Sequence, residues 1–389
     1  MTAVFGHSLV AQVPLLDVGR ANGPLREGIL AAMERVFDSG RFLYGPDVTQ
    51  LEQSLARRCG ARHAIACASG SDALLLALMA LGIEPGDEVI VPSFTFFATA
   101  SAVSRLGAKI VFADIDPVTY NMDPGQLSML ITPRTKAVIP VHLYGQCADM
   151  AALNEIANRH KLSVVEDAAQ SIGAAWLDRP AGNWGDVTCI SFYPTKNLGG
   201  CGDGGMVVTS DESLEKRLRL FSAHGMQPRY FHKVVGINSR LDSLQAAALN
   251  VKLTMLDQWT ADRQENAARY HELFHEAGLE KTLQLPVARS GATHVWNQYT
   301  IRVPEGRRDA LRNYLAQNGV GSEIYYPHPL HLQECFADLG YRRGSLPNTE
   351  RASAEVLSLP IFPGLTADEQ YTVVQRIFGF YAQRQSIAA

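Results

Sequence analysis

Short apolar runs alternate with longer amphipathic segments through the first two-thirds of the chain, and this alternation limits the possible folds more than any other feature. Several of the short runs are apolar on both faces, as strands are when helices cover a sheet on each side. Strands are therefore predicted at 63–67, 88–91, 109–113, 137–142, 163–166, 187–192 and 206–209, and helices at 71–81, 95–106, 150–160 and 212–224. This order is typical of an α/β domain with a mainly parallel, seven-stranded sheet.

The pattern changes after Asn250. A long charged helix is predicted at 257–277, followed by a strand at 298–303 and helices at 308–318 and 368–385. The chain of 389 residues also exceeds the length that one hydrophobic core usually serves, which is roughly 250–300 residues. We therefore expect a large α/β domain over 1–255 and a smaller α+β domain over 256–389.

Charge and composition argue against several classes of protein. The net charge of −4 provides no basic field for nucleic acid or for an anionic membrane. The longest apolar run, at 73–81, is far shorter than the roughly 20 residues that span a bilayer. The six cysteines are scattered without a C-x-x-C pair, so we interpret them as reduced thiols and assign no metal site. Because the N-terminus also lacks a signal-peptide pattern, we expect a soluble cytoplasmic protein.

An anion site is predicted where the first strand meets its helix. The segment Ala68-Ser-Gly-Ser-Asp72 follows the strand at 63–67 and opens a strongly apolar helix. Backbone N–H groups at a helix N-terminus bind anions, and the Gly70 backbone and the Ser71 hydroxyl would add to such a site. The alternative is a plain helix cap, because Ser and Asp are preferred there in any case.

Lys196 and Asp167 are the residues that point most directly to chemistry. Lys196 lies between a predicted strand and a glycine-rich stretch, where burial would favour the neutral amine that imine formation needs. Asp167 ends an apolar strand, at the edge where open α/β sheets bind their ligands. Gln170 follows three residues later and would lie on the same face of a helical turn. An imine-forming lysine and an aspartate for a pyridinium nitrogen are what pyridoxal phosphate (PLP) requires.

Two further segments contain residues that could lie beside a flat cofactor. In Pro92-Ser-Phe-Thr-Phe96, Phe96 is the residue chosen to stack on a heterocycle, with Phe94 as the competitor. The stretch Gly200-Cys-Gly-Asp-Gly-Gly205 matches G-x-G-x-x-G, but it leads into a strand instead of following one, so a dinucleotide site is rejected. These glycines are interpreted as allowing a tight backbone turn beside a bulky group.

Taken together, the motifs resemble those of fold-type I PLP enzymes, and specifically of the DegT-type (StrS-like) sugar aminotransferases. They occur in the family's order over nearly the whole chain. The matching stretches are Gly45-Pro…Leu51-Glu52, Ala68-Ser-Gly-Ser-Asp-Ala73, Pro92-Ser-Phe-Thr-Phe96, Pro140-Val-His-Leu-Tyr-Gly145, Glu166-Asp-Ala-Ala-Gln170, Ser191-Phe-Tyr-Pro-Thr-Lys196, Gly202-Asp-Gly-Gly205, Asn238-Ser-Arg-Leu-Asp242 and Tyr326-Pro-His-Pro-Leu-His331.

The resemblance implies a role for each site residue. Lys196 would carry the internal aldimine with PLP, and Asp167 would pair with the pyridinium nitrogen. The other cofactor-binding positions implied are Gln170 at the ring oxygen side, Phe96 stacked on the ring, Gly70, Ser71 and Ser191 at the phosphate, and Asn238 reaching the phosphate from the partner subunit of a homodimer. Arg240, His331 and Tyr326 match positions near the substrate. Simpler readings stay open for two of these, namely a structural salt bridge for Arg240 and a satisfied loop histidine for His331.

The resemblance also implies the reaction. L-glutamate would supply an amino group to a keto group of a nucleotide-linked sugar, with a 3-keto-6-deoxy or related hexose as the expected acceptor. Relatives that act on 4-keto sugars more often have histidine where Tyr193 stands, and 4-keto amination is kept as an alternative. PLP-dependent sugar dehydratases have histidine where Lys196 stands, which argues against that activity. A non-catalytic regulatory relative is the remaining alternative, although such a protein would be expected to have lost Lys196, Asp167 or the phosphate site.

Overall fold

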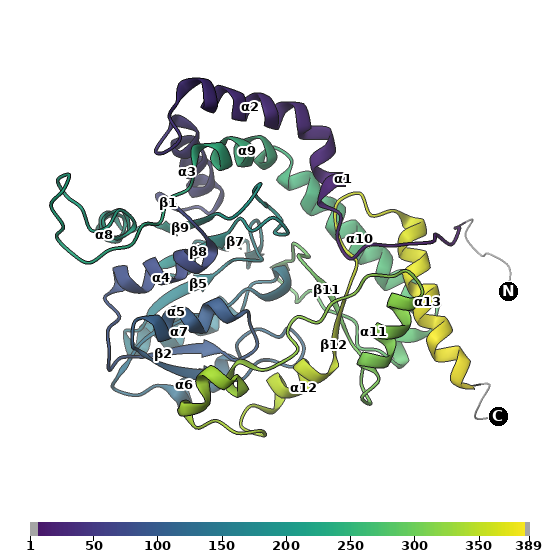
Figure 1. Ribbon diagram of the computed structural model, residues 1–389. Helices are drawn as coiled ribbons and strands as arrows, with labels where there is room; N and C mark the ends of the chain where they lie inside the picture. The colour runs from purple at the N-terminus through teal and green to yellow at the C-terminus, as the bar shows by residue number, and fades with distance from the viewer. Residues whose placement is uncertain (1–6, 386–389) are drawn as a thin grey trace.

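A seven-stranded sheet forms the centre of the computed structural model, which describes residues 7–385 (Figure 1). The strands run in the order β1-β9-β8-β5-β4-β2-β3, and β9 alone in this sheet is antiparallel to its neighbours. They are β1 (His63–Cys67), β2 (Glu88–Pro92), β3 (Lys109–Ala113), β4 (Thr135–Val138), β5 (Ser163–Asp167), β8 (Val187–Ser191) and β9 (Gly205–Thr209). The predicted mainly parallel sheet is therefore confirmed.

Strand β4 departs most from its predicted bounds. It ends at Val138, although the apolar run continues to His142. Pro140 has no N–H to give to the ladder, so regular pairing stops before it. Two isolated hydrogen bonds still hold the segment to the sheet, from Ile139 N–H to the Ile90 carbonyl and from Asp167 N–H to the Pro140 carbonyl, both 2.9 Å long.

Helices cover both faces of the sheet. Alternate residues of β2 show this, because Val89 and Val91 belong to one buried cluster and Ile90 belongs to another. The first cluster contains α4 (Gly70–Leu81) and α5 (Phe97–Arg105), and the second contains α6 (Pro124–Leu130) and α7 (Met150–His160). Helix α8 (Glu212–Ser222) packs beside α4. None of the helices in residues 7–385 is long and apolar enough to cross a membrane.

The C-terminal part is built on an antiparallel strand pair with helices around it. The predicted strand and helices are present as β11 (Tyr299–Arg302), α10 (Leu256–Glu276), α11 (Arg308–Gln317) and α13 (Ala367–Gln385). Strand β11 pairs with β12 (Val356–Leu359), which follows α12 (Pro347–Glu355); neither β12 nor α12 was predicted. A small separate sheet joins β10 (Ala292–Thr293), β6 (Ala175–Trp176) and β7 (Arg179–Pro180).

The N-terminal segment packs against the C-terminal part of the chain. Figure 1 shows it (purple) running beside α13 (yellow). Val13 N–H donates to the Gly319 carbonyl at 2.8 Å, and Arg20 forms an ion pair of 2.7 Å with Glu369. The division at residue 255 stays a prediction, and these contacts attach the first residues of the chain to the later ones. The segment leads into α1 (Val18–Asn22), α2 (Arg26–Ser39) and α3 (Pro46–Arg58), and α2 packs on α9 (Ser243–Leu253).

A close backbone approach joins β9 to the start of α4. Gly205 is paired with Cys67 at the end of β1, directly before the turn into the helix. A Cβ on Gly205 would lie 2.4 Å from the carbonyl carbon and oxygen of Ser69 and 2.8 Å from the nitrogen of Gly70. The position therefore requires glycine for lack of space, because its neighbours are backbone atoms that cannot rotate away.

We predict that Gly205→Ala lowers the free energy of unfolding by about 1–3 kcal/mol, the usual range for overpacking. Gly28→Ala is the matched control, because Gly28 is an exposed residue within α2 and the nearest atom to its Cβ position, Val251 Cγ1, is 3.5 Å away, an ordinary contact. Urea unfolding of the apo-protein measures both variants. Equal stability of the two variants would contradict the close approach of β9 and α4.

Candidate active site

The candidate active site lies where β5 and β8 end. Asp167 is the last residue of β5, Ser191 is the last residue of β8, and Lys196 follows in the next turn. These parallel strands are direct neighbours, so their carboxyl ends share one edge of the sheet. The residues singled out from the sequence are thus brought together by the topology.

Asp167 is a buried carboxylate with few hydrogen-bond donors. The Thr99 hydroxyl donates to its Oδ2 at 2.7 Å, and the Ala169 N–H donates to its Oδ1 at 3.2 Å. Burial raises the pKa of Asp167 above its ordinary value, although Thr99, Ala169 and the positive charge of Lys196 act in the opposite direction. Thr99 was missed at the level of sequence, and a threonine within an otherwise small and apolar helix face was the available signal.

The pKa of Lys196 is shifted in the opposite direction from that of Asp167. Burial lowers the pKa of its amine, and the negative charge of Asp167 opposes that change. Within this pair, burial favours the neutral form of each group while the partner favours the charged form. A lysine whose pKa is lowered has a larger fraction of the nucleophilic amine at neutral pH.

The loop that carries Lys196 is tightly turned and rests on other segments. A Cβ on Gly199 would lie 2.2 Å from the Pro194 carbonyl oxygen, so the turn depends on that glycine. Asn197 anchors the loop to the C-terminal part by donating to the Val295 carbonyl at 2.9 Å and accepting from the Asn297 amide at 2.6 Å. Asn197 was not identified from the sequence, because its partners lie about a hundred residues away.

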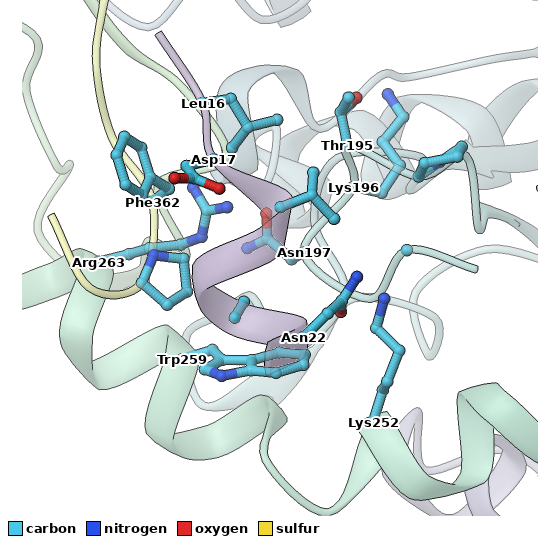
Figure 2. Close-up of a pocket in the computed structure, with 15 residues that line it drawn as sticks. Leu16, Asp17, Asn22, Thr195, Lys196, Asn197, Lys252, Trp259, Arg263 and Phe362 are labelled. Atoms are coloured by element: carbon cyan, nitrogen blue, oxygen red, sulfur yellow. The ribbon is translucent and has the colours of Figure 1, made fainter. Parts of the chain in front are cut away.

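A cavity of about 30 Å³ separates this loop from α1, α9 and α10. Figure 2 shows the amine of Lys196 pointing away from Asn22 and Lys252, which line the other side. The cavity is therefore behind the reactive side of the loop, and its volume suits a water molecule, not a cofactor.

The three residues predicted for phosphate come together at the N-terminus of α4. Ser69 caps the helix by accepting from Asp72 N–H at 3.1 Å, so the capping role belongs to Ser69. Gly70 and Ser71 begin the helix, and their N–H groups have no intrahelical acceptor. A Cβ on Gly70 would lie 2.6 Å from the Cβ of Ser191, which places the end of β8 directly against this helix start.

Aromatic and amide groups form another side of the site. Gln170 accepts from Tyr144 N–H at 2.7 Å and donates to the Tyr326 hydroxyl at 3.2 Å. The ring of Phe96 is 57% exposed and lies 6.1 Å from the ring of Tyr326, measured between centroids. Phe94, the competitor for the stacking role, is only 1% exposed and belongs to the core. The exposed ring of Phe96 is the one with a free face.

Asn238 and Arg240 lie in a different, open cleft. The cleft has a volume of about 430 Å³ and is also lined by Ala68, Asp203 and Gln245. Asn238 is exposed, and the guanidinium of Arg240 lies 6.0 Å from the centroid of the Tyr44 ring. Arg240 forms no salt bridge with any residue of 7–385, so the structural alternative for it gains no support.

His331 is a correction to the predicted substrate residues. It is 1% exposed, and both of its ring nitrogens are engaged. Nδ1 lies 2.7 Å from the Ser93 hydroxyl and Nε2 lies 3.2 Å from the Glu350 carboxylate. A ring that is buried and doubly bonded in this way has no edge left for a substrate, so the satisfied loop histidine is the reading that the structure supports.

The site fits a flat, phosphorylated pyridine. It offers free N–H groups at a helix start, an exposed aromatic face, a carboxylate that can accept from a ring N–H, and an amine of lowered pKa. Comparison with known proteins agrees with this reading. A sequence profile of the DegT/DnrJ/EryC1/StrS aminotransferase family matches residues 24–378. The chain belongs to this family.

Two relatives are similar over almost their full length. A protein of Geobacillus stearothermophilus named as a pleiotropic regulatory protein is 49% identical, with 95% of this chain and 98% of the relative covered. A UDP-N-acetyl-3-dehydro-alpha-D-glucosamine 3-aminotransferase of Acidithiobacillus ferrooxidans is 45% identical, with 92% and 95% covered.

A solved structure shows the same fold. The crystal structure of DesV from S. venezuelae, in complex with a ketimine intermediate, superposes with a TM-score of 0.91. The sequences are 44% identical, and the match covers 95% of this chain and 99% of DesV.

We predict that His331→Ala lowers the free energy of unfolding by about 1–3 kcal/mol, because it leaves buried hydrogen-bonding groups without a partner. The dissociation constant of PLP from the apo-protein should change less than about twofold, because His331 would make no contact with the cofactor. His328→Ala is the control, since His328 is exposed in the same loop. Urea unfolding and PLP titration measure the two effects, and a large loss of PLP affinity with unchanged stability would restore a direct role for His331.

Proposed function

We propose that this family member transfers the amino group of L-glutamate to the 3-keto group of a nucleotide-linked sugar, with PLP as its cofactor. The observation that carries the proposal is the pairing of Lys196 and Asp167 at the ends of adjacent strands, with burial moving their pKa values in opposite directions. Perturbed groups of this kind cluster at catalytic sites. The name of the Acidithiobacillus relative, a 3-aminotransferase of a UDP-linked 3-dehydro sugar, supports the choice of substrate.

The donor set suits PLP, which supplies an electron-accepting ring that stabilises negative charge at the carbon next to the transferred nitrogen. In the proposal, Lys196 holds the cofactor covalently and then moves a proton at the donor's α-carbon as general base and acid. Asp167 accepts a hydrogen bond from the ring nitrogen and keeps that nitrogen protonated. The N–H groups of Gly70 and Ser71, together with Ser191, bind the phosphate.

Phe96, Gln170 and Tyr326 would orient the ring. Phe96 has an exposed face for stacking, and Gln170 is held from both ends by Tyr144 and Tyr326. A side chain that is fixed by two hydrogen bonds loses little freedom when a ligand binds beside it. Tyr193 is exposed two residues beyond Ser191, and we keep it as the position that favours 3-keto over 4-keto sugars.

A homodimer with shared sites is part of the proposal. Asn238 and Arg240 lie at an exposed surface, where a second copy could use them. The large apolar side chains of Phe42, Leu43 and Tyr44 are exposed. They lie near Arg240, because Leu43 forms a β-bridge with Asp242. Phe37 packs against Phe42 and is 70% exposed. Exposed apolar groups of this density mark protein interfaces.

A cytoplasmic setting is also proposed, because the six cysteines of the chain are all free and four of them are buried.

The regulatory alternative has one specific support, which is the name of the Geobacillus relative. An aminotransferase and a regulatory protein that keeps these site residues would both be folded and bind PLP, so a measurement of turnover has to separate the two functions.

We predict that Lys196→Ala abolishes transamination while leaving the free energy of unfolding nearly unchanged, because no hydrogen bond or salt bridge joins its amine to another side chain of residues 7–385. The assay supplies PLP, L-glutamate and a panel of UDP- and dTDP-linked 3-keto and 4-keto sugars, and it detects 2-oxoglutarate and the amino sugar. Lys216→Ala is the control, because Lys216 is on the exposed face of α8. Turnover of 3-keto sugars by the unmodified protein supports the proposal, and its absence with every sugar favours a regulatory role.

We predict that Asn238→Ala weakens PLP retention and lowers activity, because a phosphate contact from the partner subunit is lost. Mixing inactive Lys196→Ala with the weakened Asn238→Ala protein should then raise activity to about a quarter of normal, above that of either variant alone, as random pairing leaves one intact site in half of the dimers. Activity is measured after subunit exchange has been demonstrated by native mass spectrometry. No recovery despite exchange would contradict the shared site.

A further inference from the structure

Thr99 is a buried hydroxyl in contact with the carboxylate at the centre of the site. It lies on α5, has no exposed surface, and donates to Oδ2 of Asp167 at 2.7 Å. The Ala169 N–H donates to the other oxygen, Oδ1, at 3.2 Å. The carboxylate is therefore held by one donor at each oxygen, which fixes its rotation about the Cβ–Cγ bond.

A second threonine determines how the hydroxyls are oriented. Thr95 Oγ1 lies 3.2 Å from Thr99 Oγ1, and Thr95 is also buried. An ionised carboxylate can only accept, so the single hydrogen of Thr99 goes to Asp167 and Thr95 donates to Thr99. The two hydroxyls form a directed chain that ends on Asp167, and each bond in such a chain strengthens the next.

Asp167 depends on these donors more than a typical buried carboxylate does. Glu166, its neighbour in β5, accepts hydrogen bonds from five groups, which are His142, Gly182, Trp184, Gly185 and Thr188. The effect of burial on the pKa of Asp167 is opposed by the Thr99 and Ala169 donors and by the electrostatic effects of Lys196 and His142, and Thr99 has the largest of these opposing effects. Among residues 7–385, Thr99 is the only hydrogen-bond donor to Oδ2.

We propose that Thr99 is a positioning residue for the cofactor, whose hydroxyl fixes the Asp167 carboxylate in the orientation and ionised state that receive the ring nitrogen of a pyridine phosphate. This inference rests on the proposed role of Asp167. A purely structural alternative exists, in which Thr99 only ties α5 to β5. The two differ in whether ligand affinity changes beyond what the loss of stability explains.

Thr188 offers a matched control for that distinction. It is also fully buried, and its hydroxyl donates to Glu166 Oε1 at 3.0 Å. Successive residues of a strand point to opposite faces, so Glu166 lies on the other side of the sheet from Asp167. Thr99→Val and Thr188→Val therefore each remove one hydroxyl–carboxylate bond at nearly constant side-chain volume, one facing the site and one facing away.

The test measures the dissociation constant of pyridoxamine 5′-phosphate from the apo-protein by equilibrium dialysis. This probe carries the pyridine nitrogen and phosphate but forms no covalent bond with Lys196. Urea unfolding of each apo-protein is measured in parallel. Thr99→Val should raise the dissociation constant roughly tenfold, as the loss of a hydrogen bond to a charged group does. Thr99→Ser should restore most of the affinity, and Thr188→Val should lower stability while leaving affinity unchanged.

Asp167→Asn is included so that two failures can be told apart. If Asp167→Asn weakens binding and Thr99→Val does not, the positioning role of Thr99 is overturned while the proposed function stands. If both leave the affinity unchanged, the role of Asp167 is overturned and the inference with it. Equal losses of affinity in Thr99→Val and Thr188→Val would reduce Thr99 to a structural residue.

Discussion

Asp167 and Lys196 can carry opposite charges in a place where burial disfavours the charged form of both. The other groups of the site lie around this pair. Burial alone would neutralise each group, while each charge stabilises the other. The balance places the lysine closer to the free amine and the aspartate closer to protonation than either would be in water. A ligand with a ring N–H and a carbonyl group could donate a hydrogen bond to Asp167 and form an imine with Lys196.

Close contact between backbones makes this arrangement possible. Gly70 lies against Ser191, Gly205 lies against Ser69, and Gly199 lies against Pro194. Each contact brings a helix start, a strand end or a loop closer than a side chain would permit. Asn197 also holds the loop bearing Lys196 to Val295 and Asn297, so the C-terminal part of the chain supports it. The site is therefore a product of the whole fold, although its reactive groups come from two short motifs.

The central sheet was predictable because its signal is local. Each of the seven predicted strands is an apolar run and is present, and except for β4 the bounds agree to within one residue. Strand β12 was missed because it pairs with a partner far along the chain, as the pairing of Ile301 with Leu357 illustrates. The helices α2, α3, α6, α9 and α12 were not predicted either. Lys196, Asp167, Gly70 and Ser191 lie near one edge of the sheet, where the strand ends and the family resemblance led us to expect them. Thr99, Asn197 and the true environment of His331 were not predicted, because side-chain pairing across 68 to 238 residues leaves no pattern in the sequence.

The buried carboxylates of the protein separate structural roles from catalytic ones. Glu88 is bonded to Thr132, Arg134 and Lys109, which lower its pKa to about 2, and the five donors around Glu166 also lower its pKa. These groups are satisfied by the fold and gain nothing from a ligand. Asp167 differs, because burial raises its pKa despite its donors, and the lysine whose charge acts on it, Lys196, has a lowered pKa of its own. A scaffold protein would be more stable with an apolar pair at these two positions. The presence of this costly pair in a chain that belongs to a family of aminotransferases is the physical argument for catalysis over a regulatory role.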